Sequence, residues 1–411
     1  MNISLKLYIT MARKFVKKML SKKVGVCNFI LIIFTNLFGL FHADTADFIE
    51  LHKYPVEFHN VVTEDGYILG VFRIPYSPHN TGTFNVSRPV FLLQHGILMS
   101  SDCWVITDPR HGLPFFLADA GFDVWMINSR GNRYSRRHQH LDPDGTQFWQ
   151  FSFHEMGIHD LPNTIDFVLR HTNQTGLHFV GHSQGATAFL VMLSLRPEYG
   201  EKIFSSHLLA PVAFQRHSSS WLARNLLENA LQLPDIEIPA IHPSLQEVIH
   251  SVCSISWMRV ICKYILLFFA GGESKHLDEM LVPRIMSIVL AGISSRQLRH
   301  FASNIKYDRF ALLDFGDQEN LRVYGSLRPP EYPLESIRTL LPINLYFGGK
   351  DKWLDVKDSR KLIRILPKSN LNVMPKWNHV DFIFGDKGKA CLNELLIINT
   401  NKFQKITTED G

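Results

Sequence analysis

Cysteine is scarce in this chain of 411 residues, which contains five cysteines and no Cys-x-x-Cys pair. Structural zinc sites are usually built from such pairs, so the sequence does not support one and we expect no metal. No internal repeat or low-complexity stretch is present, which argues against a solenoid and a largely disordered chain. With 45% hydrophobic and 20% charged residues, the composition is that of a globular protein with a large core.

Acidic residues are absent from the first 43 positions, which hold seven of the 43 lysines and arginines. The rest of the chain has 36 basic residues against 38 acidic ones, so the formal net charge of +5 comes entirely from the N-terminus. A body without a basic excess gives no electrostatic support for nucleic acid binding. We therefore expect no nucleic acid partner.

The basic N-terminus precedes an apolar stretch from Val24 to Phe41. This order is the signature of a secretory signal peptide, so we interpret residues 1–43 as a signal that is cleaved after Ala43. Met11 or Met19 could be the functional start. An uncleaved membrane anchor is the alternative, because the apolar run nearly reaches the length that spans a bilayer. A signal peptide predicts an extracellular or lysosomal location.

Two sequons and two cysteines agree with passage through the secretory pathway. The chain reads Asn-Val-Ser at Asn85 and Asn-Gln-Thr at Asn173, which makes both asparagines candidate glycosylation sites. Cys253 and Cys262 are close enough in sequence to form a disulfide within one helical hairpin or loop, as an oxidising compartment permits.

Strands and helices are expected to alternate along most of the chain. Alternating apolar residues on both sides of Asp65-Gly66 indicate a hairpin, and continuous apolar runs predict strands that are buried on both faces. Strands are expected at 90–96, 122–128, 177–180, 207–213, within 343–353 and at 371–375, and helices at 114–121, 159–172, 184–196 and 356–366. This alternation predicts an α/β fold with a mostly parallel central sheet covered by helices on both faces.

The alternation breaks between about 215 and 334, where the sequence is helical and irregular. The simplest account is a helical insertion in the sheet domain, which divides the core into 44–214 and 335–411. An independent domain at 215–334 is the alternative, although no linker rich in proline, glycine or serine flanks it.

The pentapeptide Gly-His-Ser-Gln-Gly places Ser183 between a predicted strand and a predicted helix. This is the context of a nucleophile elbow, in which the serine adopts a strained backbone and small residues on both sides let strand and helix pass. The amide of Gln184 then lies at the N-terminus of the helix, where positive dipole gathers. Ser183 is therefore the candidate nucleophile.

A serine hydroxyl needs a base, and elbow enzymes carry their triad in the order serine, acid, histidine. Asp351 follows a predicted strand and a Gly-Gly turn, and His379 follows the last predicted strand. Both placements fit, because ligands bind at the carboxyl ends of parallel strands. Asp355 is the alternative acid. Asp381 is expected to face elsewhere.

His182 and Ile97 are two further residues to consider around the candidate nucleophile. His182 is not expected to act as a base, since its side chain should leave the elbow in the opposite direction. An oxyanion hole needs a second amide besides that of Gln184, and His95-Gly96 makes a tight turn after the first buried strand. The amide of Ile97 is the candidate donor.

Several long motifs in the correct order resemble the acid lipases, the group of gastric and lysosomal lipases and their insect relatives. The motifs lie between about Tyr54 and Gly385 and read LLQHGILMSSDCWV, GFDVWMINSRGNRYSRRH, FWQFSFHEMGIHDLPNTIDFVL, FVGHSQGATAFLVM, LLAPVA and NHVDFIFG. The resemblance implies an α/β-hydrolase core with a helical cap and lid at 215–334, acting on neutral lipid esters without a cofactor.

The resemblance also assigns roles to particular residues. It matches Ser183 to the nucleophile, Asp351 to the acid and His379 to the base, with Ile97 and Gln184 as the oxyanion amides. Cys253 and Cys262 match the cap disulfide in spacing. Two departures lie in the cap: a third cysteine is replaced by Ala270, and IVLAGISS (288–295) stands where the family often has Pro-Ala-Gly.

The sequence therefore predicts a monomeric serine lipase that hydrolyses triacylglycerols or cholesteryl esters at an oil–water or membrane interface. The first alternative is a carboxylesterase for smaller, soluble esters on the same fold. The second is a non-catalytic lipid-binding protein on a lipase fold, which the intact serine, aspartate and histidine argue against.

Overall fold

An eight-stranded sheet with the order β1-β2-β4-β3-β5-β6-β9-β10 organises the chain from Asp44 onward. The structure is a computed structural model. It describes residues 43–80, 88–220, 225, 229–385, 392–398 and 400. The expected signal segment, apart from Ala43, and the sequon at Asn85 lie outside these residues.

The strands of this sheet pair mostly in parallel. They are β1 (Glu57–Val62), β2 (Ile68–Ile74), β3 (Val90–Gln94), β4 (Asp123–Ile127), β5 (Leu177–His182), β6 (Ile203–Leu209), β9 (Ile343–Gly348) and β10 (Ser369–Met374). β2 pairs antiparallel with both β1 and β4, and the remaining neighbours pair in parallel. The predicted fold class is confirmed.

Burial explains why the central strands could be read from the sequence. Every residue of β3, β4, β5 and β9 is buried, which matches their continuous apolar runs, since helices cover both faces of a parallel sheet. The hairpin between β1 and β2 turns at Gly66, whose φ of +95° suits glycine.

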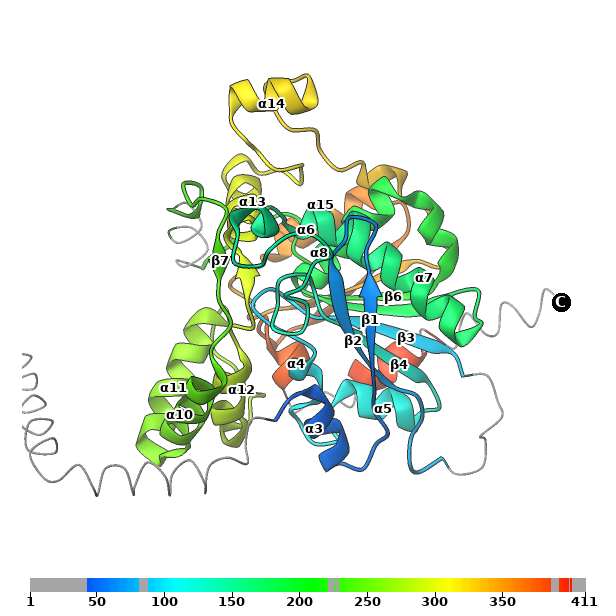
Figure 1. Ribbon diagram of the computed structural model, residues 1–411, viewed down its shortest axis with the longest axis vertical. Coiled ribbons are helices and arrows are strands. Elements are labelled where there is room, and N and C mark those ends of the chain that lie inside the picture. Colours follow the sequence, from blue (N-terminus) through cyan, green and yellow to red (C-terminus); the bar gives the residue numbers. More distant parts are fainter. Residues whose placement is uncertain are drawn as a thin grey trace, which may run out of the picture. The chain divides into compact units, whose positions relative to one another are not determined.

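Helices lie on both faces of the sheet. In Figure 1, α7 (Leu161–Thr172), α8 (Gln184–Leu195) and α15 (Val356–Ile365) lie over one face and α5 (Leu113–Asp119) over the other. The helix α8 begins directly after β5, so the residue between them, Ser183, lies at the carboxyl end of a central strand.

One predicted strand was displaced along the chain. The sequence predicts a strand at 207–213, whereas β6 ends at Leu209. Ala210 has a left-handed φ of +48°, and Pro211 has no amide hydrogen to donate to a ladder. The strand instead begins at Ile203 and includes Ser205 and Ser206. Because these two residues are polar, the apolar pattern did not predict this part of the strand.

The helix predicted from residue 159 also begins earlier. Phe153–Glu155 (α6) leads into a π-helical turn, Met156–Asp160 (η2), and then into α7. π-turns are rare and often accompany functional sites. The side chain of Gln184 donates to the Met156 sulfur (3.5 Å), so this turn packs against the start of α8.

The region between β6 and β9 is built mainly of helices. Its elements are β7 (Glu237–Ile238), α10 (Pro243–Ser254), α11 (Ser256–Phe269), η4 (Glu279–Leu281), α12 (Val282–Ile288), β8 (Ile293–Ser294), α13 (Ser295–Tyr307), α14 (Asp317–Tyr324) and η5 (Leu334–Ser336). We call this region the cap. Figure 1 shows α10, α11 and α12 packed together beside the sheet.

A disulfide between Cys253 and Cys262 joins α10 to α11, so the expected cysteine pair is present. In the part of the chain that the structure describes, no single helix is long and apolar enough to cross a membrane. Together α10 and α11 meet the length and composition for a span, but they are bent by 114°.

Candidate active site

Ser183 occupies a strained turn at the end of β5. Its φ of +52° and ψ of −118° are rare for a residue with a Cβ, and such strain persists only where the surroundings enforce it. The Ser183 amide donates to the Leu209 oxygen in β6 (2.9 Å), and the Ser183 oxygen accepts from the Ala186 amide (3.0 Å). Neighbouring strand and helix therefore hold the turn.

The two glycines of the pentapeptide leave no room for a side chain. A Cβ on Gly181 would lie 2.8 Å from the Ala186 nitrogen, and one on Gly185 would lie 2.5 Å from the Gln94 oxygen. Helix α8 thus passes directly against β5 and β3. The helix and the strands therefore approach each other closely at Gly181 and Gly185, as the sequence led us to expect.

The structure brings Ser183, His379 and Asp351 into one chain of hydrogen bonds. His379 Nε2 lies 2.9 Å from Ser183 Oγ, and His379 Nδ1 lies 2.8 Å from Asp351 Oδ2. The other carboxylate oxygen of Asp351 accepts from the amides of Trp353 (2.8 Å) and Leu354 (3.1 Å). A carboxylate held this way fixes the imidazole with Nδ1 protonated and Nε2 free to accept the serine proton.

The two other carboxylates near these loops have structural partners. Asp355 is the N-cap of α15 and accepts from the Lys357 amide (2.8 Å). Asp381 accepts from the Asn378 amide (2.7 Å) and from the hydroxyl of Ser274. Burial raises the pKa of Asp381. Of the two candidate acids, Asp351 is the one that contacts His379.

The side chain of His182 does not leave the site, contrary to the expectation from the sequence. Its Nε2 donates to the backbone oxygen of His379 (2.9 Å), and the two rings lie 5.2 Å apart. Burial lowers the pKa of His182 to about 3, so it stays neutral and keeps Nε2–H as a donor. His182 therefore supports the loop of His379 rather than acting as a base. Only its place beside Ser183 could have signalled this.

Both candidate oxyanion residues lie near Ser183: Ile97 lines the same cavity, and Gln184 is the next residue in the chain. Gln184 is the first residue of α8, where a backbone amide has no partner within its helix. Ile97 follows Gly96, and both line the cavity that contains Ser183 and His379. The Gly96 oxygen accepts from His95 Nδ1 (2.8 Å), which fixes the peptide group that carries the Ile97 amide.

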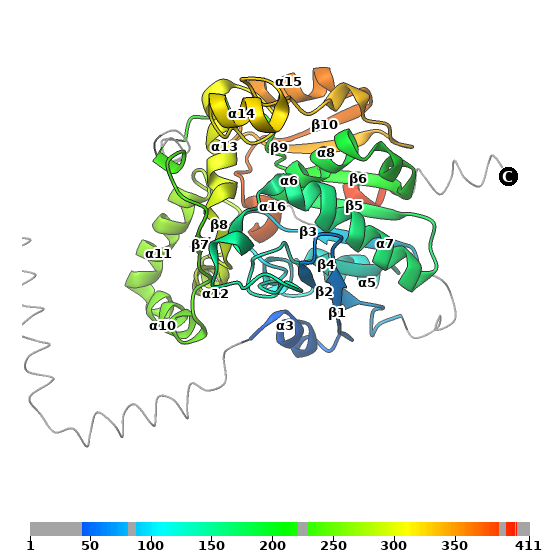
Figure 2. The same cartoon turned by 45° about the horizontal axis from the view of Figure 1, so that its top comes forward.

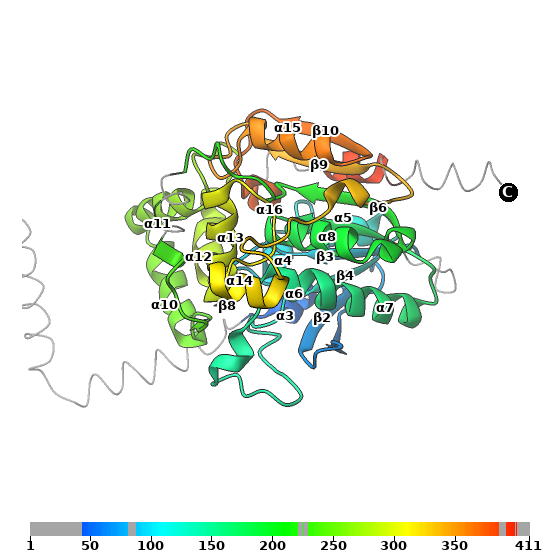
Figure 3. The same cartoon turned by 90° about the horizontal axis from the view of Figure 1, so that it is seen from above.

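The cavity over Ser183 has a volume of about 360 Å³ and mainly apolar walls. The core contributes Leu98, Val212 and Phe384, and the cap contributes Ile265, Phe269 and Leu290. In Figures 2 and 3, α16 (Asp381–Phe384), which follows His379 directly, lies between the cap helices and the sheet. The arrangement can present an apolar ester to a serine nucleophile.

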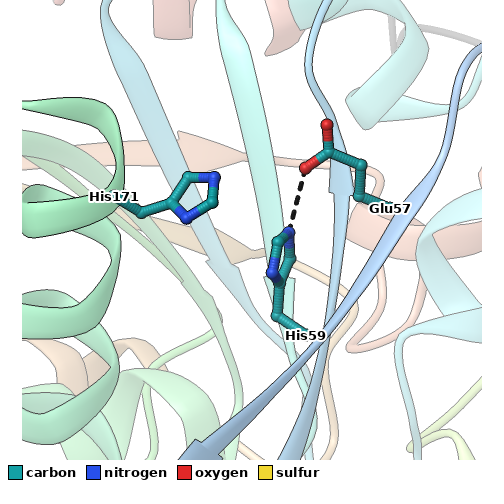
Figure 4. A group of neighbouring side chains, drawn as sticks. All are labelled: Glu57, His59 and His171. Atoms are coloured by element: carbon teal, nitrogen blue, oxygen red, sulfur yellow. Dashed lines mark hydrogen bonds and ion pairs between the residues drawn. The ribbon is translucent and has the colours of Figure 1, made fainter.

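Glu57, His59 and His171 are the three described residues whose side chains approach a metal-binding arrangement, with ligand atoms within 4.8 Å of one another. Figure 4 shows His171 on its helix facing the Glu57–His59 pair. Arg73 donates to Glu57 (2.8 Å) and to His171 Nε2 (3.2 Å). A cation would have to displace these hydrogen bonds beside a guanidinium, so we assign the cluster to the packing of α7 on β1 and β2.

The fold and this geometry define a serine hydrolase of the α/β-hydrolase class. A family described as partial alpha/beta-hydrolase lipase region matches residues 45–108, and one described as alpha/beta hydrolase fold matches residues 89–242. Among solved structures, a membrane phospholipase A described as a bacterial virulence factor has a TM-score of 0.53 at 15% identity, with 95% of this chain and 99% of that chain covered. This likeness shows the fold alone.

Curated relatives narrow the class to one family. Lipase 3 of Drosophila melanogaster is 39% identical over 358 residues, covering 84% of this chain and 90% of its own. Gastric triacylglycerol lipase of Homo sapiens is 36% identical over 374 residues, covering 88% and 93%. The chain therefore belongs to the acid lipase family of α/β-hydrolases and is a carboxylic ester hydrolase.

Acid is expected to weaken the fold between about pH 6.5 and pH 4. Burial lowers the pKa of five histidines, to about 4 for His95 and His178 and to about 3 for His182, His207 and His300. The unfolded chain binds protons at these residues below pH 6.5 whereas the folded chain does not, so stability falls as the pH falls. Each histidine costs at most about 1.4 kcal/mol per pH unit in this window.

Urea unfolding at pH 7, 6 and 5 measures this loss. His207→Gln removes one of these titrating groups and should make the dependence shallower by about one proton. An unfolding free energy that is equal at pH 7 and pH 5 contradicts the prediction.

Proposed function

We propose that Ser183, His379 and Asp351 form a catalytic triad that hydrolyses neutral lipid esters to free fatty acids. The observation that carries this proposal is the unbroken hydrogen-bond chain from Ser183 Oγ through His379 to Asp351 on the wall of an apolar cavity. Two similar proteins are named gastric triacylglycerol lipases, of human and of mouse, so triacylglycerol is the first substrate to test. Cholesteryl esters are the second.

The reaction proceeds through an acyl-enzyme. His379 Nε2 takes the hydroxyl proton of Ser183 as Oγ attacks the ester carbonyl, and Asp351 stabilises the imidazolium. The amides of Ile97 and Gln184 donate to the oxyanion. The imidazolium then gives its proton to the leaving alcohol. Water, deprotonated by His379, attacks the acyl-enzyme, and the fatty acid leaves as Ser183 regains its proton.

The outer surface of the cap supports a lipid rather than a soluble substrate. Helix α11 contributes Ile265, Leu266 and Phe269 to the cavity wall. The same helix exposes Trp257 (66%), Tyr264 (67%) and Phe268 (52%). Exposed apolar residues on a helix mark an interaction site, and here they lie on the same helix as part of the cavity lining. A carboxylesterase for dissolved esters has no use for such a surface.

We also propose that the chain passes through the secretory pathway. Its described sequon supports this, because Asn173 and Thr175 are exposed and Asn173 ends α7 with a left-handed φ of +53°. The disulfide between Cys253 and Cys262 requires an oxidising compartment. Similarity to gastric lipases points the same way.

Replacing Ser183 by alanine tests the triad. Ester hydrolysis should fall by about 10⁴-fold or more, because the nucleophile is lost while the amides of the oxyanion site remain. A fluorescent phosphonate should label the wild-type chain and not S183A. Ser194→Ala is the matched control, since Ser194 is a buried serine of α8 that only donates to the Val191 oxygen. Hydrolysis by S183A at the wild-type rate rules out the triad.

Removing the exposed aromatic residues of α11 tests the choice between lipase and carboxylesterase. The double variant Trp257→Ser/Tyr264→Ser should adsorb about tenfold or more weakly to emulsified long-chain triacylglycerol, because each ring loses apolar burial at the interface. Its rate on a dissolved short-chain ester should not change. Tyr307→Ser, which changes another exposed aromatic residue of the cap, is the control. A wild-type chain that prefers the dissolved ester favours the carboxylesterase.

Glycan removal tests passage through the secretory pathway. The chain produced in a eukaryotic host should lose mass on treatment with an N-glycosidase. Asn173→Gln and Thr175→Ala should each abolish the part of the shift that belongs to Asn173, because both break the sequon and Thr175→Ala keeps the asparagine. An unglycosylated wild-type chain that stays in the cytosol refutes this location.

A further inference from the structure

The end of cap helix α11 contacts both loops that carry the proposed acid and base. A helix ends with backbone oxygens that have no partner inside it. Here the Phe269 oxygen accepts from the Trp353 indole nitrogen (2.9 Å), and the Gly271 oxygen accepts from the Lys352 amide (2.8 Å). The Gly272 oxygen accepts from the Asn378 side chain (2.9 Å). The loops of Asp351 and His379 thus supply hydrogen-bond donors to the backbone oxygens at the end of α11.

Trp353 is the residue that connects this helix end to the carboxylate. Its own amide donates to Asp351 Oδ1 (2.8 Å), which leaves Oδ2 for His379. Its indole is fixed by Phe269 and lies so close to Gly271 that a Cβ there would be 2.2 Å from the ring. Gly271 has a φ of +79°, so it is suited to glycine for its backbone as well as for this contact.

The Trp353 ring is also held by the interior of the cap. Like Leu298, it packs against a small hydrophobic cluster of Ala230 and Ala302, and Trp353 also lines the cavity over Ser183. Trp353 therefore has its backbone amide at the carboxylate, its ring against the cap and its indole N–H at the end of α11.

We propose that Trp353 is a positioning residue that fastens the loop of Asp351 to the cap, so that the cap sets the geometry of the catalytic acid. This inference rests on the proposed triad. The cap then has a second role besides covering the cavity: it holds the carboxylate at the distance from His379 that stabilises the imidazolium during the chemical step.

Trp353→Phe tests this role, because phenylalanine keeps a ring and the backbone amide but removes the indole donor. We expect kcat to fall about three- to tenfold, the usual effect of one lost hydrogen bond, with KM unchanged. The loss should be equal for acetyl and for long-chain esters. A residue that is only a wall of the cavity would instead raise KM, and its effect would grow with the length of the acyl chain.

Trp149→Phe is the matched control, since the Trp149 indole also donates to a single backbone oxygen, that of Pro143 (2.8 Å), and Trp149 does not line the cavity. It should keep the wild-type kcat. Thermal unfolding of both variants checks that each is folded. Equal kcat for W353F and the wild-type chain overturns the inference and leaves the proposed lipase activity intact.

A double-mutant cycle shows whether Trp353 acts through the carboxylate. Asp351→Asn removes the charge that the loop positions, so adding Trp353→Phe to D351N should cost nothing further, as measured by the rate of phosphonate labelling at Ser183. Additive losses in the two variants refute the positioning role. A wild-type chain without esterase activity or labelling would instead refute the proposed function, so the two failures are distinguishable.

Discussion

The left-handed backbone of Ser183 is the constraint on which the rest of the structure depends. A residue with a Cβ pays for this conformation, and it is kept only because three strands and a helix enforce it. The Ser183 amide is fixed to β6 through Leu209, and Gly185 lies against the Gln94 oxygen at the end of β3. The neighbouring strands β3 and β6 therefore hold the Ser183 hydroxyl at the carboxyl edge of the sheet.

The cap contacts the loops of Ile97, Asp351 and His379. The Ala291 amide of the cap donates to the oxygen of Leu98 (3.0 Å), the residue that follows Ile97. The end of α11 completes the loops of Asp351 and His379 through Trp353 and Asn378. Leu98 and Leu290 both have left-handed backbones, with φ of +64° and +63°. The segment 288–295, where the resemblance shows a departure from Pro-Ala-Gly, therefore meets the loop of Ile97.

The parts of the site that depend on residue type and residue order could be predicted from the sequence. The apolar runs of the buried strands, the small residues around Ser183 and the order of Ser183, Asp351 and His379 could all be read directly. β6 was displaced because Ser205 and Ser206 are polar although they are buried in the sheet. The contacts of His182 with the His379 oxygen and of Trp353 with the Phe269 oxygen could not be predicted. In both contacts a side chain donates to a backbone oxygen far away in sequence. Every residue has a backbone oxygen, so no pattern of residue types indicates such a contact.

The two longest motifs of the family resemblance, at 121–138 and 148–169, contribute no side chain to the cavity. Arg130, which is fully buried, donates to Asp160 (2.7 Å) on the π-turn and to Asp65 (2.6 Å) at the β1–β2 hairpin. Breaking such a buried pair leaves an uncompensated charge, which costs about 3–5 kcal/mol. These contacts therefore hold the β1–β2 hairpin and the π-turn against the segment that follows β4. The π-turn that Arg130 anchors brings Met156 against the Gln184 side chain. Arg130 thereby links both motifs to the start of α8, beside Ser183.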